Sequence, residues 1–309
     1  MSGVKFVSWR TSTDFLKRRQ IALQLAARLG RGRGGMRWLD QVNPPPRARI
    51  APNFAGWEDR KLSAVWIGHA TVLLRVAGMT VLTDPVFANR IGLGLWLATL
   101  GPRRHIAAAA TARQIPKIDL ILISHAHFDH LDRQSLAGLD KKTPVIMAEH
   151  TRDLVWDLGY RDVRELRWGE QARFNGLSIT SREVRHWGAR TFFDQHRGYN
   201  AYLLEGSRGR VLFGGDTAYQ ELFKDIARVD LAIMGIGAYD PYIHAHATPE
   251  QVWTMANHVR ADFVLPVHHS TFRLSHEPMH EPLERILTAA GKEGGRIPVR
   301  EPGGTWTAD

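Results

Sequence analysis

Residues 118–132 read IDLILISHAHFDHLD, and this stretch decides the fold that we expect. Its LILI run, 120–123, is typical of a strand buried on both faces of an α/β sheet. Four potential metal ligands follow within six residues, at the carboxyl end of that strand, where open α/β sheets tend to place their sites: His125, His127, Asp129 and His130. Asp132 is then a favourable N-cap for a short helix over 133–139.

The four side chains predict a metal site rather than a group of ordinary surface histidines. At the histidine frequency of this chain, 15 in 309 residues, three His and one Asp at set positions would arise by chance in roughly two of a thousand such chains. Imidazole nitrogens and carboxylate oxygens suit Zn²⁺, Mn²⁺ or Fe²⁺, and the crowding indicates more than one ion. Because neighbouring residues of an extended chain cannot easily reach one ion, we expect His125 and His127 to face one metal, and Asp129 and His130 to reach a second.

The rest of the chain alternates between strand-like and helix-like patterns, which indicates α/β material. Strands are predicted at 63–67, 71–77, 80–83, 144–148, 163–166, 177–184, 199–204, 210–213, 231–236 and 263–267. The strands at 199–204 and 210–213 are predicted to form a hairpin across 206–209. Helices are predicted at 151–158, 218–226 and 282–290. A further helix begins at Thr248, where the sequence TPEQ is a capping box with proline at the first helical position.

The motif HAHFDH at 125–130 matches the HxHxDH signature of the metallo-β-lactamase superfamily. Six further segments, together spanning much of residues 60–300, resemble the branch that contains N-acylphosphatidylethanolamine-hydrolysing phospholipase D and its bacterial relatives. They are WIGHATVLL (66–74), LTDPVF (82–87), FGGDTAY (213–219), GIGAYDP (235–241), HATPEQ (246–251) and VHHSTF (267–272). The resemblance implies the fold of that family, a four-layer αβ/βα sandwich with two mixed β-sheets and outer helices.

The same resemblance implies a set of ligands for two divalent ions. The first ion would be held by His125, His127 and His186, the second by Asp129, His130 and His268, and Asp216 would bridge them. At His269 this chain departs from the phospholipase pattern, in which a tryptophan and then a glycine are more familiar. Either imidazole of the pair could therefore be the last ligand, and we choose His268.

Other residues are expected around the metals rather than on them. Asp84 falls where a carboxylate could orient a ligand histidine, and we expect His69 in a similar supporting position. His246 matches a family position on the substrate side, so we expect it to donate a hydrogen bond to the bound substrate. Asp129 is predicted to guide a proton in addition to binding metal.

These residues predict a dinuclear metal-dependent hydrolase. Two cations about 3.5–4 Å apart can hold a hydroxide between them and lower the pKa of its parent water, and that hydroxide attacks phosphorus or an acyl carbon. The favoured substrate is a phosphodiester, as in N-acylphosphatidylethanolamine phospholipase D, and a lactone or other ester is the alternative. A nuclease or a non-catalytic binding protein is less favoured. Zn²⁺ is the expected metal, with Mn²⁺ and Fe²⁺ as alternatives.

Residues 1–59 are predicted to be a basic extension that precedes a hydrolase domain at 60–309. They contain eleven Lys/Arg and four Asp/Glu, so they carry 11 − 4 = +7 of the formal net charge of +10. The apolar spacing in 14–29 predicts an amphipathic basic helix, and the prolines of 44–46 predict a stiff connector. This helix could contact an anionic membrane surface or pack against its own domain.

The remaining composition limits where the protein could act. No apolar run approaches the length of a spanning helix, no cysteine is present, and Gln24 interrupts the only candidate for a signal peptide. We therefore expect a cytoplasmic protein, which would lie at the inner membrane face if residues 1–59 bind lipid. We expect no dedicated nucleic-acid partner, and a homo-oligomer is compatible with the sequence. The segment 91–100, IGLGLWLATL, is either a hydrophobic lip that includes Trp96 or a buried segment.

Overall fold

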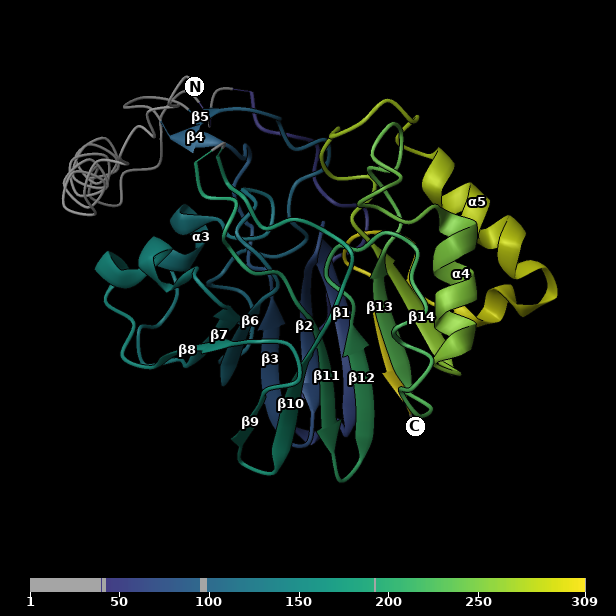
Figure 1. Ribbon diagram of the computed structural model, residues 1–309, viewed down its shortest axis with the longest axis horizontal. Coiled ribbons are helices and arrows are strands. Elements are labelled where there is room, and N and C mark those ends of the chain that lie inside the picture. The colour runs from purple at the N-terminus through teal and green to yellow at the C-terminus, as the bar shows by residue number, and fades with distance from the viewer. Residues whose placement is uncertain (1–39, 41–42, 95–98, 192, 309) are drawn as a thin grey trace, which may run out of the picture.

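The computed structural model describes residue 40 and residues 43–94, 99–191 and 193–308. The predicted helix at 14–29 and Trp96 of the predicted lip lie outside these residues. Within them, two β-sheets face each other and the helices lie on the outside, as Figure 1 shows. This is the α/β sandwich with two mixed sheets that the resemblance implies.

The first sheet combines antiparallel and parallel strands. Its order is β15 (Thr305–Ala308), β1 (Leu62–Gly68), β2 (Thr71–Val76), β3 (Met79–Thr83), β6 (Leu120–Ile123), β7 (Val145–Ala148) and β8 (Val163–Leu166). Neighbours from β15 to β3 pair antiparallel, whereas β3, β6, β7 and β8 run parallel. Because β6 lies in the interior of this sheet, all four of its residues are buried, as its apolar sequence predicts.

The second sheet is mixed as well. Its order is β14 (Phe263–Val267), β13 (Leu231–Gly235), β12 (Gly209–Phe213), β11 (Ala201–Gly206), β10 (Leu177–Arg182) and β9 (Gln171–Phe174). The strands β12, β13 and β14 are parallel, and β11 and β12 form the predicted antiparallel hairpin. Strands β9 and β15 were not predicted, and the predicted strand ends agree with the structure to within two residues.

Side chains alternate between an inner and an outer apolar layer. Along β6, Leu120 and Leu122 point into the core between the sheets, while Ile121 and Ile123 point outwards. Helix α3 (Arg133–Ala137) covers that outer face, and Asp132 caps it by accepting hydrogen bonds from its first free N–H groups, as predicted. The helix is shorter than the predicted 133–139.

On the other side of the sandwich, helices α4 (Pro249–His258) and α5 (Glu281–Ala290) cover β13 and β14 (Figure 1). The predicted capping box is present: the Thr248 side chain accepts from the Gln251 N–H, and the Gln251 side chain accepts from the Thr248 N–H. None of the helices in the described part of the chain combines the length and apolarity that crossing a bilayer requires.

Two predicted helices are wrong. Residues 151–158 form two 3₁₀ turns, Arg152–Leu154 and Trp156–Leu158, because buried Val155 between them leaves the helical region at φ −125°. Residues 218–226 form turns rather than a helix. Asp216, just upstream, faces a group of histidines and caps no helix there.

The hydrophobic segment 91–100 is described at its two ends. Strand β4 (Leu93–Gly94) pairs with β5 (Thr99–Leu100), and Leu93 and Leu100 are exposed. Upstream, Trp57 is buried against the outer face of the first sheet and donates a hydrogen bond to the Thr80 hydroxyl at 3.0 Å. Trp57, near the end of the predicted extension, therefore packs on the sandwich.

Candidate metal centre

The predicted site residues meet at one edge of the sandwich, where strands of both sheets end. Two hydrogen bonds join the sheets at this edge: Asn200 N–H donates to Ser124 O at 2.9 Å, and the Tyr202 hydroxyl donates to Ile123 O at 2.9 Å. Several turns here have left-handed backbone at non-glycine residues, including His69 (φ 54°) and His268 (φ 63°). Such backbone persists only where the surroundings enforce it, and it is common at functional sites.

Three imidazoles form what we call the first cluster, His125, His127 and His186. His127 Nδ1 lies 2.8 Å from His125 Nε2 and 3.3 Å from His186 Nε2. Burial lowers the pKa of all three rings, and for His125 and His186 it does so to well below the usual range. Neutral imidazoles whose nitrogens converge in this way fit a cation between them.

The second cluster is Asp129, His130 and His268. Asp129 Oδ2 lies 3.4 Å from His130 Nε2 and 3.2 Å from His268 Nε2. His130 Nε2 is buried and faces the carboxylates of Asp129 and Asp216, although neither contact has hydrogen-bond geometry.

Asp216 lies between the clusters. Its Oδ2 is 3.8 Å from both His125 Nε2 and His186 Nε2, and 3.1 Å from both His130 Nε2 and His268 Nε2. With the first cluster, it forms one group of four possible ligands whose atoms all lie within 4.8 Å of one another. This placement agrees with the bridging role that the resemblance implies.

The second cluster differs from the first in its charges. Burial disfavours the charged form of His268, but the Asp216 charge and the Asp129 hydrogen bond outweigh it and raise the pKa of His268 to about 9. Burial also disfavours the charged form of His130, but the charges of Asp216, Asp129 and Asp84 outweigh it and raise the pKa of His130 well above its usual range. Burial likewise opposes ionisation of Asp129 and Asp216, but the charge of His130 holds both carboxyl pKa values well below normal. Without metal, protons supply the positive charge that the carboxylates require.

Asp84 is placed as predicted, in contact with a histidine of the second cluster. Its Oδ2 accepts from His130 Nδ1 at 2.6 Å and from the Ser124 hydroxyl at 2.6 Å, and its Oδ1 accepts from Ser124 N–H at 2.7 Å. The Ser124 hydroxyl also lies 2.9 Å from His125 Nδ1. One carboxylate therefore orients a ring in each cluster, directly in one case and through Ser124 in the other.

His69 lies closer to the centre than the prediction of a supporting position required. Its Nε2 is 2.8 Å from Asp129 Oδ2, and it falls within 4.8 Å of the ligand atoms of the second cluster. Burial lowers the pKa of His69 to about 3, so this ring is neutral. It can donate to Asp129 or serve as a further ligand.

The structure distinguishes the two candidate histidines at the end of β14. His268 faces Asp129 and Asp216, whereas the His269 ring packs on Trp66 at a centroid distance of 4.7 Å and its Nδ1 lies 2.9 Å from the Ser270 hydroxyl. Only the first of the pair can reach the clusters.

The predicted substrate-side residue also belongs to this centre. His246 Nδ1 lies 3.9 Å from Asp216 Oδ2, and its ring is 5.0 Å from that of His186. Burial lowers the pKa of His246 to about 4. The His186 ring is oriented by the neighbouring loop, because its Nδ1 donates to Ala245 O at 3.0 Å.

Two supporting residues were missed in the sequence. Ser124 carried a weak signal, because it is the polar residue between an apolar strand and the first histidine. Arg190 carried none: its Nη1 donates to Ala126 O at 3.1 Å and to Leu131 O at 2.9 Å, and its guanidinium lies 4.0 Å from the Phe128 ring centroid. It therefore clamps the loop that supplies ligands to both clusters.

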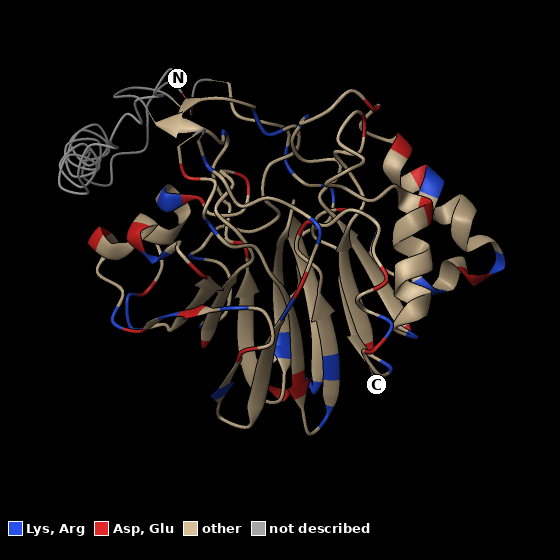
Figure 2. Ribbon diagram, in the orientation of Figure 1, with Lys and Arg blue, Asp and Glu red and all other residues tan. Residues whose placement is uncertain are grey.

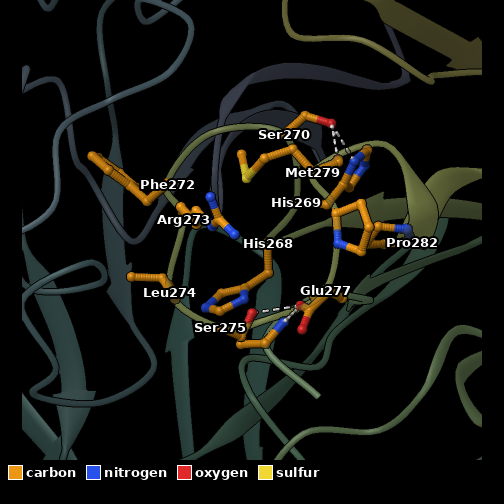
Figure 3. A pocket seen from close by; sticks show the side chains of 13 residues that line it. His268, His269, Ser270, Phe272, Arg273, Leu274, Ser275, Glu277, Met279 and Pro282 are labelled. Carbon is orange, nitrogen blue, oxygen red and sulfur yellow. Dashed lines mark hydrogen bonds between the residues drawn. The ribbon is translucent and has the colours of Figure 1, made fainter. Parts of the chain in front are cut away.

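Behind His268, the loop 268–282 encircles a cavity of about 10 Å³, shown in Figure 3. That volume holds about one water molecule and no substrate. The Glu277 carboxylate fixes the loop by accepting from the Ser275 hydroxyl at 2.6 Å and from Ala238 N–H at 2.6 Å. A substrate must therefore reach the clusters from another side.

Comparison with known proteins agrees with this centre. Residues 79–269 match the family model described as a beta-lactamase superfamily domain. An uncharacterized protein of Mycobacterium tuberculosis is 31% identical over 272 residues, covering 84% of this chain and 72% of that protein. N-acyl-phosphatidylethanolamine-hydrolyzing phospholipase D 1 of Caenorhabditis elegans is 32% identical over 232 residues, or 68% of this chain. The mitochondrial enzyme of that name from Saccharomyces cerevisiae is 32% identical over 238 residues, or 72% of this chain. The matches span 64% and 50% of the lengths of these two phospholipases.

Solved structures share the fold at lower sequence identity. An isothiocyanate hydrolase from Delia radicum gut bacteria superposes with a TM-score of 0.65 at 17% identity, covering 80% of this chain and 98% of that one. CmlA, a diiron β-hydroxylase from Streptomyces venezuelae, gives a TM-score of 0.58 at 17% identity, covering 81% and 54%. At such identities the likeness concerns the fold alone.

Proposed function

This chain belongs to the metallo-β-lactamase superfamily, as one of its metal-dependent hydrolases, and we propose that it hydrolyses a phosphodiester of the N-acylphosphatidylethanolamine type. One observation carries the proposal: Asp216 Oδ2 lies between two clusters of possible ligands, within 3.8 Å of a nitrogen on either side. Such a donor set fits two divalent cations, of which Zn²⁺ is the one we expect.

The proposed ligands follow the two clusters. His125, His127 and His186 would hold the first ion, Asp129, His130 and His268 the second, and Asp216 both. When bound, the two ions polarise the phosphoryl group and acidify a water molecule. Asp84 accepts a hydrogen bond from His130 Nδ1, and the Ala245 carbonyl accepts one from His186 Nδ1. In each ring Nε2 is then the nitrogen that can bind a metal.

The remaining chemistry falls to two side chains on the open side of the centre. Asp129 is positioned to accept a proton from the attacking water, because part of its carboxylate stays accessible. His246 is positioned to donate a hydrogen bond to a phosphoryl oxygen of the substrate. Water adds to phosphorus, the bond from phosphorus to the leaving oxygen breaks, and the leaving oxygen takes the proton held by Asp129 and departs as the alcohol.

The choice of a phosphodiester is supported by the two phospholipases D at 32% identity. A nuclease is less well supported. Basic and acidic positions are interspersed along the described ribbon in Figure 2, and residues 60–309 carry only +3 of the net charge, because +7 of +10 lies in 1–59. Binding to a nucleic-acid backbone requires a concentration of cations along the bound strand.

The test compares substrates on the metal-loaded protein. Bis(p-nitrophenyl) phosphate and an N-acylphosphatidylethanolamine should be turned over with Zn²⁺ or Mn²⁺, and a strong chelator should abolish the turnover. The His268→Ala variant should lose it, whereas His150→Ala, a change at an exposed histidine, should retain it. Hydrolysis of a homoserine lactone without hydrolysis of either phosphodiester would reverse the assignment.

The basic extension, residues 1–59, leads to a second part of the proposal, contact with an anionic membrane. At about 1 kcal/mol per Lys or Arg near an anionic membrane, a segment with the charge of 1–59 would bind phospholipid surfaces measurably. Deletion of residues 1–39 should weaken sedimentation with anionic vesicles and leave turnover of the soluble diester unchanged. Equal sedimentation of the truncated protein would remove the membrane contact from the proposal.

A further inference from the structure

Among the described residues, the least buried side of the metal centre is formed by His127 and Asp129, and we call this side the opening. The rings of His125, His130 and His268 are almost completely buried. In contrast, His127 is only half-buried, and Asp129 keeps 12% of its side-chain surface accessible. We therefore expect a substrate to approach past His127 and Asp129.

Trp187 stands at this opening. It is 40% exposed, and its ring lies 4.9 Å from that of His127 and 6.2 Å from that of His246. The His244 ring stacks nearly parallel to it, at 6.4 Å and 17°. The indole therefore connects the proposed metal ligands with rings further out.

The row of side chains continues away from the centre. The Tyr242 ring lies 6.5 Å from that of His244, and Tyr242 and Ile243 are 40% and 52% exposed. We call Trp187, Tyr242, Ile243 and His244 the aromatic strip. Trp187 lies beside the proposed ligand His127, and Tyr242, Ile243 and His244 add exposed side chains from the loop 237–247.

The loop that presents the strip is held in place by backbone hydrogen bonds. The N–H groups of Ala245 and His246 both donate to Tyr242 O, at 2.8 and 2.9 Å, and Ala247 N–H donates to Thr217 O at 2.8 Å. The Ala245 carbonyl in turn accepts from the proposed ligand His186. Because the surface exists before a ligand arrives, binding to it costs little ordering entropy.

The chemistry of this loop selects an apolar ligand. Residues 237–247 contain one acidic residue, Asp240, and no lysine or arginine. A polyanion such as a nucleic-acid strand would find no partner there, whereas a hydrocarbon chain would remove exposed tryptophan, tyrosine and isoleucine surface from water. On the basis of the function proposed above, we propose that the aromatic strip binds the hydrocarbon chain of the phosphodiester substrate.

The first test varies the chain length. With p-nitrophenyl alkyl phosphates below their micellar concentrations, kcat/KM of the metal-loaded protein should rise about 16-fold from butyl to octyl, or about twofold per methylene, half of the roughly fourfold gain that complete burial gives. The double variant Tyr242→Ser/Ile243→Ser should reduce this gain to less than fourfold. The gain is expressed relative to each protein's own turnover of the methyl diester, so that a change in basal activity is taken into account.

Trp187→Ala should also flatten the chain-length dependence, and its metal content is measured because the indole contacts His127 and His186. Trp156→Ala is the matched control, since Trp156 is 68% exposed on a 3₁₀ turn outside the centre. An unchanged gain in both strip variants, or no gain in the wild type, would overturn the proposal.

A binding measurement separates this proposal from the proposed function. Calorimetric titration of the metal-loaded protein should show that octylphosphonate binds about tenfold more tightly than butylphosphonate, in the wild type and in Trp156→Ala but not in the double variant. If the protein prefers octylphosphonate but hydrolyses no phosphodiester, the strip binds hydrocarbon chains and the proposed phosphodiesterase activity is wrong. If it hydrolyses bis(p-nitrophenyl) phosphate but shows no preference for octylphosphonate, the phosphodiesterase activity stands and the proposed role of the strip is wrong.

Discussion

The two clusters of the centre use similar side chains but differ in charge. The first cluster consists of neutral imidazoles, whereas the second holds two protonated imidazoles against two carboxylates. The difference lies in the carboxylates: Asp129 and Asp216 both lie within 3.4 Å of His130 and His268, and only Asp216 reaches the first cluster, at 3.8 Å. A cation can enter the first cluster without displacing protons, but the second must release them.

The largest effect is expected for Asp216→Asn, which removes the charge shared by both clusters. Metal content should fall from two ions per chain to one or fewer, and kcat/KM for bis(p-nitrophenyl) phosphate should fall about 10³-fold. Metal analysis and turnover of the same preparation check this. The control is Asp225→Asn, which alters an exposed carboxylate paired with Arg182. Full metal content in Asp216→Asn would show that neither cluster needs the Asp216 charge to bind its ion.

The pH dependence of metal binding should separate the clusters next. Since the pKa of His268 is raised to about 9, its proton is present below that pH and must leave when a metal binds. Affinity at the second cluster should therefore rise between pH 7 and pH 9, about tenfold per unit for each proton displaced. The first cluster should change little over this range, because its rings are already neutral.

Two variants isolate the clusters for that measurement. His127→Ala keeps the second cluster and should show the steep dependence, whereas His268→Ala keeps the first and should show a shallow one. Competition with a chelator of known affinity at pH 7, 8 and 9 gives both slopes. Equal slopes would contradict the assigned charges.

A smaller effect is expected at the residues that orient the rings. Asp84→Asn should weaken metal binding about 10- to 100-fold at both clusters, because Asp84 contacts His130 directly and His125 through Ser124. Ser124→Ala should weaken the first cluster about tenfold and leave the second nearly unchanged. Ser124→Thr keeps the hydroxyl and should restore binding. Equal losses at both clusters in Ser124→Ala would refute the relay.

The smallest difference between the clusters is expected for Arg190→Ala, because Arg190 holds the loop that serves both. Removing two hydrogen bonds to a charged donor should lower the free energy of unfolding by about 2–3 kcal/mol and weaken both clusters alike. Arg190→Lys should recover only part of the stability, since one ammonium cannot reproduce the guanidinium fork. Urea unfolding with chelator present measures the free energy of unfolding, and chelator competition measures metal affinity. A loss of affinity confined to one cluster would show that Arg190 does not support both.

Most of the fold could be predicted because its strands carry strong local signals. The LILI run of β6 and the hairpin of β11 and β12 are found as predicted. The failures have a common cause. At 218–226 the upstream residue Asp216 is committed to contacts with residues distant in sequence, and at 151–158 the burial of Val155 overrides helix propensity.

The candidate site divides in the same way. The histidines and aspartates could be predicted because short motifs place them directly after strands. Ser124 and Arg190 could not, because their roles depend on which carbonyls and rings the fold brings near them. His269 illustrates the limit best: sequence could not separate it from its neighbour, whereas the turn after β14 sends the two rings to opposite surroundings.

The position of the centre at the seam between the sheets has a consequence for assembly. Four of the proposed ligands follow β6 of the first sheet: His125, His127, Asp129 and His130. The other three follow β10, β12 and β14 of the second: His186, Asp216 and His268. Neither sheet with its loops supplies all the proposed ligands of either ion, so bound ions would cross-link the two halves of the sandwich. Ion uptake is then a late event in maturation, and the loaded protein should resist separation of its halves far better than the stripped one.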